Sequence, residues 1–184
     1  MEFEFFWQSS SPFSQWYLAD YTINGTTFSC CEQGMMYAKA KLFGDEDAAR
    51  QILLSRSPKD VKVLGRLVKN FKQAVWEANR ERIVYEGNMA KFSQNALLCE
   101  RLLRTGSKTL VEASPYDRIW GIGMRASDPR ANDPSKWNGL NLLGSILTRV
   151  KNDLRSTATP SISIATATAT VVEASDAVEV ELAI

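Results

Sequence analysis

Glu32 and Lys39 form a pair of residues whose types and spacing could do chemistry. They are seven residues apart in a segment, 31–43, whose pattern predicts a helix. Seven residues are close to two helical turns, so both side chains point the same way, about 20° apart around the axis. A carboxylate can stabilise a developing cation, and a desolvated lysine can act as a nucleophile. Either residue alone would normally be solvated, but Met35 and Met36 indicate a partly buried face.

A second group of candidate residues follows a predicted strand. Glu112 and Asp117 add two carboxyl groups, and either could donate a proton to a leaving group. Trp120 could stack on a base or fill the core. Gly121 and Gly123 would let the backbone approach a flat or bulky group, although a lone Gly-x-Gly is a weak signal.

The absence of histidine narrows the possible chemistry. With no histidine among 184 residues, Ser-His-Asp and Cys-His catalysis are excluded. Cys30, Cys31 and Cys99 lack the paired spacing of a zinc site, so no metal site is predicted, and their odd number argues against a disulfide framework. Carboxylates, lysine, arginine, tyrosine or cysteine must therefore carry any catalysis.

The elements that must position these residues are mainly helical, with a small β-hairpin or sheet element, in a single compact domain. Hydrophobic periodicity and capping residues predict helices at about 31–43, from 46, from 58, 73–89, from 94, and 142–154. Strands are expected at 3–7, 17–23, 26–30 and 109–114, with Asn24-Gly25 as a hairpin turn. Ser93 is expected to cap one helix and Asn141 the last.

The chain divides into a domain at 1–155 and a tail at 156–184. The tail alternates Ser, Thr, Ala and Val without aromatic residues, and we expect it to be disordered. The sequence shows no signal peptide and no apolar run long enough for a membrane span. We therefore expect an intracellular, cytoplasmic protein, with the nucleus possible. A net charge of +1 gives no overall attraction to nucleic acid.

Several motifs in a fixed order give the chain a resemblance to a known family. They lie at 11–16 (SPFSQW), 32–40, 91–95 (KFSQN), 105–106, 111–123 (VEASPYDRIWGIG) and 137–144 (WNGLNLLG). Together they make residues 5–154 similar to the NADAR family of YbiA-like proteins. One position departs from the family pattern: Gln33 stands where the family usually has a histidine.

The resemblance implies a mainly helical N-glycosidase that needs no cofactor and cuts a bond between ribose C1′ and nitrogen. It favours removal of ADP-ribose from guanine in nucleic acid or a nucleotide. The alternative is cleavage of phosphoribosyl intermediates of riboflavin synthesis. A third hypothesis is a non-catalytic module that binds ADP-ribose or NAD.

The resemblance also implies which residues form the site. Glu32, Lys39 and Asp117 are the catalytic candidates. The substrate-binding candidates are Gln15, Trp16, Gln33, Lys91, Asn95, Glu112, Trp120, Gly121, Gly123 and Asn141. Arg66, Arg80 and Lys91 are candidates to bind phosphate.

Overall fold

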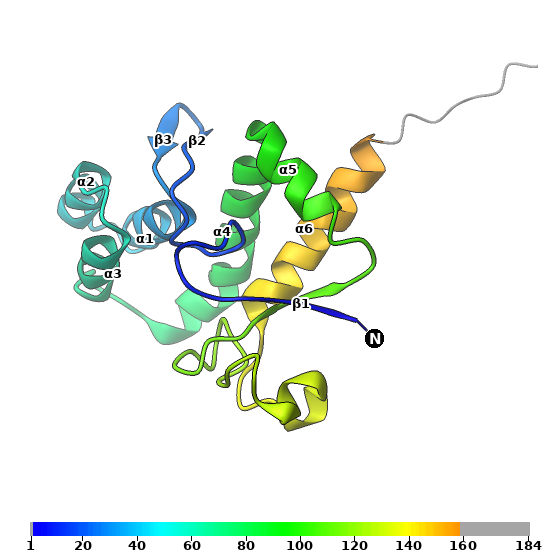
Figure 1. The fold of residues 1–184 in the computed structure, drawn as a ribbon. Helices are drawn as coiled ribbons and strands as arrows, with labels where there is room; N and C mark the ends of the chain where they lie inside the picture. Colours follow the sequence, from blue (N-terminus) through cyan, green and yellow to red (C-terminus); the bar gives the residue numbers. More distant parts are fainter. Residues whose placement is uncertain (1, 159–184) are drawn as a thin grey trace, which may run out of the picture.

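Helices make up most of the regular structure in residues 2–158, the part of the chain that this computed structural model describes (Figure 1). The predicted class, mainly α with a small sheet element, is confirmed. The strands are β1 (Phe3–Phe6), β2 (Tyr21–Ile23), β3 (Thr26–Phe28) and β4 (Thr109–Glu112). The α-helices are α1 (Cys31–Leu42), α2 (Glu46–Leu54), α3 (Pro58–Arg66), α4 (Gln73–Gln94), α5 (Ala96–Leu103) and α6 (Leu142–Ala158).

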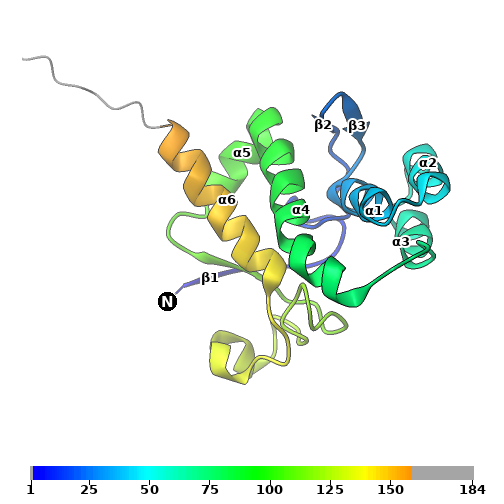
Figure 2. The same ribbon diagram turned by 180° about the vertical axis from the view of Figure 1, so that it is seen from behind.

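Helix α4 is the centre of the fold. It contacts α1 on one side and both α5 and α6 on the other, while α2 and α3 pack beside α1 at one end of the molecule (Figures 1 and 2). Phe92, Leu102 and Leu147 are fully buried between these helices. Burying one such side chain contributes roughly 1.5–3 kcal/mol, so this core holds α1 firmly in place.

Two of the predicted helix starts, those of α2 and α3, are confirmed by side-chain caps. The side chain of Asp45 accepts the N–H of Ala48, and that of Ser57 accepts the N–H of Asp60. Gly44 has a φ of 70° just after α1, a left-handed conformation that glycine adopts without strain. These signals lie within a few residues of each helix end, so the sequence alone could reveal them.

The predicted end of α4 is wrong. The helix continues past Met89 to Gln94, and Ser93 lies inside it instead of capping the next helix. Gly87 does not weaken this helix, because its missing side chain leaves room for Tyr21, whose hydroxyl oxygen would lie 3.3 Å from a Cβ there. Asn95 separates α4 from α5.

The two pairs of strands are shorter than predicted. In the hairpin, β2 and β3 pair over three residues each, and Asn24 and Gly25 both have positive φ, as a tight two-residue turn requires. In the other pair, β1 and β4 run parallel with Phe6 opposite Glu112. Residues far apart in the sequence therefore meet where these two strands end.

The segment between β4 and α6 is ordered by its own hydrogen bonds. It includes two short 3-10 helices, η1 (Pro129–Asn132) and η2 (Pro134–Lys136). Asn141 does not cap α6 with its side chain as predicted. Its amide instead bridges β4, accepting the N–H of Glu112 (2.9 Å) and donating to the carbonyl of Leu110 (3.1 Å). This bridge fixes Glu112 at the end of β4.

Helix α6 continues through Ala158, three residues beyond the predicted domain boundary at 155. The rest of the predicted tail lies outside the described residues.

Candidate active site

Glu32 is a buried residue at the start of α1. Only 4% of Glu32 is exposed, so Glu32 is not a solvated surface residue. Its backbone N–H donates to the carbonyl of Gln15 (2.9 Å), which joins the first turn of α1 to the loop before β2. Met35 and Met36, one turn further on, are also buried. This face of α1 therefore forms a wall inside the molecule, as the sequence predicted.

The wall faces a cavity of about 530 Å³. It brings together seven predicted site residues: Gln15, Trp16, Glu32, Lys39, Glu112, Trp120 and Asp117. They come from three separate places: the loop before β2, helix α1, and the end of β4 with the segment that follows it. The structure thus places the three catalytic candidates around one space.

Burial raises the pKa of Glu32 to about 7. Asp117 raises it further, whereas Lys62, the Trp16 indole and Arg66 favour the charged carboxylate and oppose this effect. The neighbouring cations therefore favour the charged form of Glu32, which can lose or gain a proton near neutral pH.

Glu112 shows the same effect more strongly. Burial, helped by the nearby carboxyls of Asp117 and Glu32, raises its pKa to about 8. Its Oε2 is buried and has no hydrogen-bond partner among the described residues. In contrast, Asp117 Oδ1 accepts the N–H groups of Ile119 (2.8 Å) and Trp120 (2.7 Å) and is held by its own turn. Of these carboxyls, Glu112 is therefore the better placed to carry a proton at neutral pH.

Lys39 lies half-buried, two turns after Glu32 on the same face of α1. Its ammonium donates to the carbonyl of Gly65 (2.8 Å) and lies 4.4 Å from the centre of the Phe71 ring. Burial lowers its pKa, and Glu32 acts in the opposite direction. The missing side chain of Gly65 leaves room for Met36, which a Cβ there would overlap.

Unpaired polar atoms mark the same cavity. Besides Glu112 Oε2, the side-chain nitrogen of Gln15 is buried without a partner, although its oxygen accepts from Asn88 (3.2 Å). Leaving a buried polar group unpaired costs about 1–3 kcal/mol, so such groups are normally satisfied. Two such groups therefore lie on residues that line this one cavity.

Gln33 does not face the cavity. Its side-chain oxygen accepts from the backbone N–H (2.7 Å) and hydroxyl (3.0 Å) of Ser29. Its nitrogen donates to three carbonyls at the end of α2 and beyond, those of Ile52, Leu53 and Ser55. A side chain so fully engaged holds α2 against α1 and has no capacity left for substrate.

Lys91 and Asn95 also act within the fold. Lys91 is fully buried and donates to the carbonyls of Pro12 (2.7 Å) and Ser14 (3.2 Å), which fixes the loop that carries two cavity residues. Asn95 donates to the carbonyl of Asp20 (3.1 Å). Both were predicted to bind substrate, and the structure places both outside the cavity.

The predicted glycines approach their own chain instead of a ligand. A Cβ at Gly121 would lie 2.8 Å from the Glu112 carbonyl oxygen. At Gly123, where φ is 67°, a Cβ would meet Asn138 and Arg118. Like Asn141, these glycines shape the segment after β4 without lining the cavity.

The sequence analysis did not identify most of the cationic residues of the site. Lys62, Arg66 and Arg118 line the cavity, but of the phosphate candidates only Arg66 does so. Lys62 and Arg66 lie one turn apart on α3. This spacing is the one sequence signal that could have placed them on a common face. On a helix with solvent-facing charges, that spacing does not reveal which face meets a cavity.

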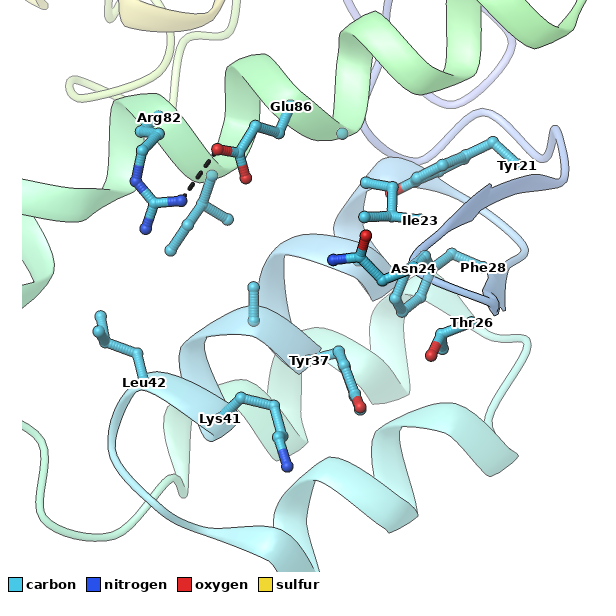
Figure 3. Close-up of a pocket in the computed structure, with 14 residues that line it drawn as sticks. Tyr21, Ile23, Asn24, Thr26, Phe28, Tyr37, Lys41, Leu42, Arg82 and Glu86 are labelled. Carbon is cyan, nitrogen blue, oxygen red and sulfur yellow. Dashed lines mark hydrogen bonds and ion pairs between the residues drawn. The ribbon is translucent and has the colours of Figure 1, made fainter.

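A second pocket lies on the opposite face of α1, between α4 and the hairpin (Figure 3). Figure 3 shows Tyr21, Phe28 and Tyr37 toward one side and the ion pair of Arg82 and Glu86 (2.9 Å) on α4 toward the other. None of the predicted site residues lines it.

Comparison with known proteins agrees with this site. The model of the NADAR domain matches residues 5–155. The chain belongs to the NADAR domain family. The N-glycosidase R617 of Acanthamoeba polyphaga mimivirus is 44% identical over 146 residues, which cover 77% of this chain and 86% of R617. As a NADAR protein this similar to a named N-glycosidase, the chain is a hydrolase that acts on N-glycosyl bonds.

Two further similarities bear on fold and substrate. The NMR structure of the E. coli protein YbiA shares the NADAR fold, with a TM-score of 0.70, 26% identity, and coverage of 85% of this chain and 87% of YbiA. The chloroplastic riboflavin biosynthesis protein PYRR of Zea mays is 32% identical over 115 residues, 60% of this chain but only 17% of PYRR.

Residues 2–158 contain neither a candidate membrane span nor a candidate metal site. No helix there has the length and apolar character needed to cross a membrane. Nor do three or more acidic, cysteine or histidine side chains within that range gather as metal ligands would.

Proposed function

We propose that the N-glycosyl bond cleaved by this NADAR enzyme joins ADP-ribose to a guanine base. One observation carries the proposal: a buried carboxyl cluster and a group of cations share a cavity with two tryptophans. Lys62, Arg66 and Arg118 suit the phosphates of an ADP-ribose. Trp16 and Trp120 offer rings on which a base can stack.

The carboxyl cluster offers both groups that the reaction needs: a carboxylate to stabilise a cation and a carboxyl group to donate a proton. When the bond between C1′ and nitrogen breaks, the electron pair goes to nitrogen and positive charge builds on C1′ and the ring oxygen. Glu32, whose charged form is favoured by Lys62 and Arg66, would stabilise that cation. Glu112, which is protonated at neutral pH, would give its proton to the leaving nitrogen.

Lys39 would then capture C1′. As the base leaves, the neutral amine bonds to C1′; the C1′–O4′ bond then breaks, O4′ takes up a proton and a Schiff base forms between Lys39 and C1′, and addition of water to C1′ releases the lysine and the sugar. Burial favours the neutral amine. The competing mechanism keeps Lys39 charged as a phosphate anchor and lets water attack C1′ directly.

A phosphoribosyl intermediate of riboflavin synthesis is the second candidate substrate. The similarity to PYRR, whose name places it in riboflavin biosynthesis, favours it. Such a molecule contains the same ribose C1′ bonded to nitrogen and a single phosphate, so the carboxyl cluster would act on it in the same way.

The substrate is tested by incubating the protein with an ADP-ribosylated oligonucleotide and, separately, with the aminopyrimidine ribosyl phosphate. We expect free ADP-ribose and unmodified oligonucleotide from the first, at a higher kcat/KM than release of ribose phosphate from the second. A higher value for the second would favour the riboflavin intermediate. Tight binding of ADP-ribose without turnover of either would instead indicate a binding module.

A further inference from the structure

Two aromatic side chains lie against each other at the mouth of the active site. The rings of Trp7 and Tyr116 have centroids 6.0 Å apart. The guanidinium of Arg125 lies 5.6 Å from the centre of the Trp7 ring. Tyr116 is 81% exposed, so burial of its ring contributes little to the stability of the fold.

The pairing of β1 with β4 brings these residues together. Trp7 directly follows β1, and the N–H of Ala113 donates to the carbonyl of Phe6 (2.9 Å), which extends the pairing past the end of β4. Tyr116 comes three residues later. The aromatic pair is therefore fixed to the same strand end that positions Glu112.

The pair borders a second cavity of about 600 Å³ that continues the active site. Trp16, Lys62, Asp117 and Tyr116 itself line both this cavity and the one that contains Glu32. A ligand can therefore extend from the carboxyl cluster to the aromatic pair.

We propose that Trp7, Tyr116 and Arg125 form a ledge that stacks a base next to the modified guanine in a single-stranded nucleic acid. This rests on the proposed function and makes an oligonucleotide, rather than a free nucleotide, the preferred substrate. Exposed aromatic rings beside arginine bind single strands because every base has a face that can stack.

The openness of the ledge favours a neighbouring nucleotide over the adenine of ADP-ribose itself. Pockets normally enclose 70–90% or more of a small ligand, and the cavity around Glu32, about 530 Å³, is within the usual range for one. A strand that continues past the site, by contrast, leaves one side of each base in solvent, as the exposure of Tyr116 requires.

The charges around the ledge fit a polyanion of modest affinity. Arg125 is exposed beside Trp7, and Lys62 and Arg66 line the connecting cavity. Glu112 and Asp117 also line that cavity and oppose the attraction. We therefore expect binding that weakens as salt is raised.

The test compares one modified guanine in two settings: within a single-stranded DNA oligonucleotide and as the free ADP-ribosylated mononucleotide. We expect Trp7→Ala and Arg125→Ala, which change residues outside the cavity around Glu32, to lower kcat/KM on the oligonucleotide about fivefold or more and to change it less than about twofold on the mononucleotide. Leu97→Ala and Arg101→Ala, exposed residues on α5, are the matched controls.

An equal loss on both substrates would overturn the proposal and assign the ledge to the adenine of ADP-ribose. No loss on either would overturn it as well. Binding of an unmodified single-stranded oligonucleotide, measured by fluorescence anisotropy, separates this proposal from the proposed function. The ledge would be supported and the proposed function refuted if no ADP-ribosylated substrate is cleaved, the wild type binds this oligonucleotide, and Tyr116→Ala weakens that binding about fivefold. Absence of binding by the wild type would refute it.

Discussion

The two faces of α1 border cavities of the same size, about 530 Å³ each, with different contents. One face carries Glu32 and Lys39 and meets two further carboxyls. The other carries Gly34 and Tyr37 and meets aromatic rings and an ion pair at the pocket edge. Cavity size therefore does not distinguish them. Buried ionisable groups with displaced pKa values do, and they mark functional sites more often than volume does.

Unpaired polar atoms occur on both sides, but they differ in kind. The active site leaves a carboxylate oxygen and an amide nitrogen unpaired, from Glu112 and Gln15. The pocket of Figure 3 has the hydroxyl of Tyr21, which lies near the Cys31 thiol without a hydrogen bond of normal geometry. The comparison predicts large effects on activity on one side of α1 and small effects on the other.

The largest effect is expected at Lys39. If it is the nucleophile, Lys39→Arg should lower turnover on the order of 10³-fold although the charge is kept. Borohydride added during turnover of the ADP-ribosylated substrate should reduce the Schiff base and add the mass of one reduced ADP-ribose to Lys39, as located by peptide mapping. Lys41→Arg, on the opposite face of α1, is the matched control and should keep both activity and adduct. An active Lys39→Arg, or no adduct in the wild type, would favour direct attack by water.

Glu32→Gln should cost on the order of 10²-fold in kcat, the scale of one lost electrostatic contact in the transition state. The fold and ligand affinity should be retained, which thermal melting and ADP-ribose titration can check. Glu86→Gln, in the pocket of Figure 3, should stay near wild-type activity. Near-normal turnover of Glu32→Gln would remove Glu32 from the mechanism.

The pH profile should sharpen the difference between the two glutamates. With pKa values of about 7 for Glu32 and about 8 for Glu112, kcat should fall below about pH 7 as Glu32 gains a proton. It should also fall above about pH 8 as Glu112 loses its proton. Glu112→Gln should lower kcat and abolish the alkaline fall. An alkaline fall that survives in Glu112→Gln would assign the donor elsewhere, with Asp117 the next candidate.

Stability should depend on pH through the same groups. The pKa of Glu112 is about 8 in the folded protein and 4.5 as its ordinary value, so the folded state binds more protons between these limits. The free energy of unfolding should therefore fall as pH rises, by up to about 1.4 kcal/mol per pH unit for this group. In urea titrations at pH 5 to 8, Glu112→Gln should flatten this slope and Glu86→Gln should not. An unchanged slope in Glu112→Gln would mean that this carboxyl does not carry the shift.

The smallest effect is expected from Tyr21→Phe. Its hydroxyl lies between α1 and α4, so close to Gly34 that a Cβ at that glycine would overlap it. Since it makes no regular hydrogen bond, its removal should leave kcat unchanged and raise stability by at most about 1 kcal/mol, as measured by the urea midpoint. A clear loss of activity would show that the two faces of α1 are coupled.

Local signals account for what the sequence predicted well. Helix caps at Asp45 and Ser57 and the Asn24-Gly25 turn depend on neighbouring residues alone. The seven-residue spacing of Glu32 and Lys39 placed both on one wall for the same reason. Where distant contacts decide, prediction failed: the side chain of Asn141 bonds to β4 and does not cap α6.

The sequence by itself determined the helical class, the shared face of α1 and the pair of carboxyls near the end of β4. Only the tertiary structure decided which polar residues line the cavity, because side chains in the recognised motifs, such as Gln33 and Lys91, use their hydrogen bonds within the fold. It also decided that Lys62 from α3 joins Glu32, and that Glu112 is buried deeply enough to stay protonated. Burial and charge depend on residues distant in the chain, and no spacing within one segment encodes them.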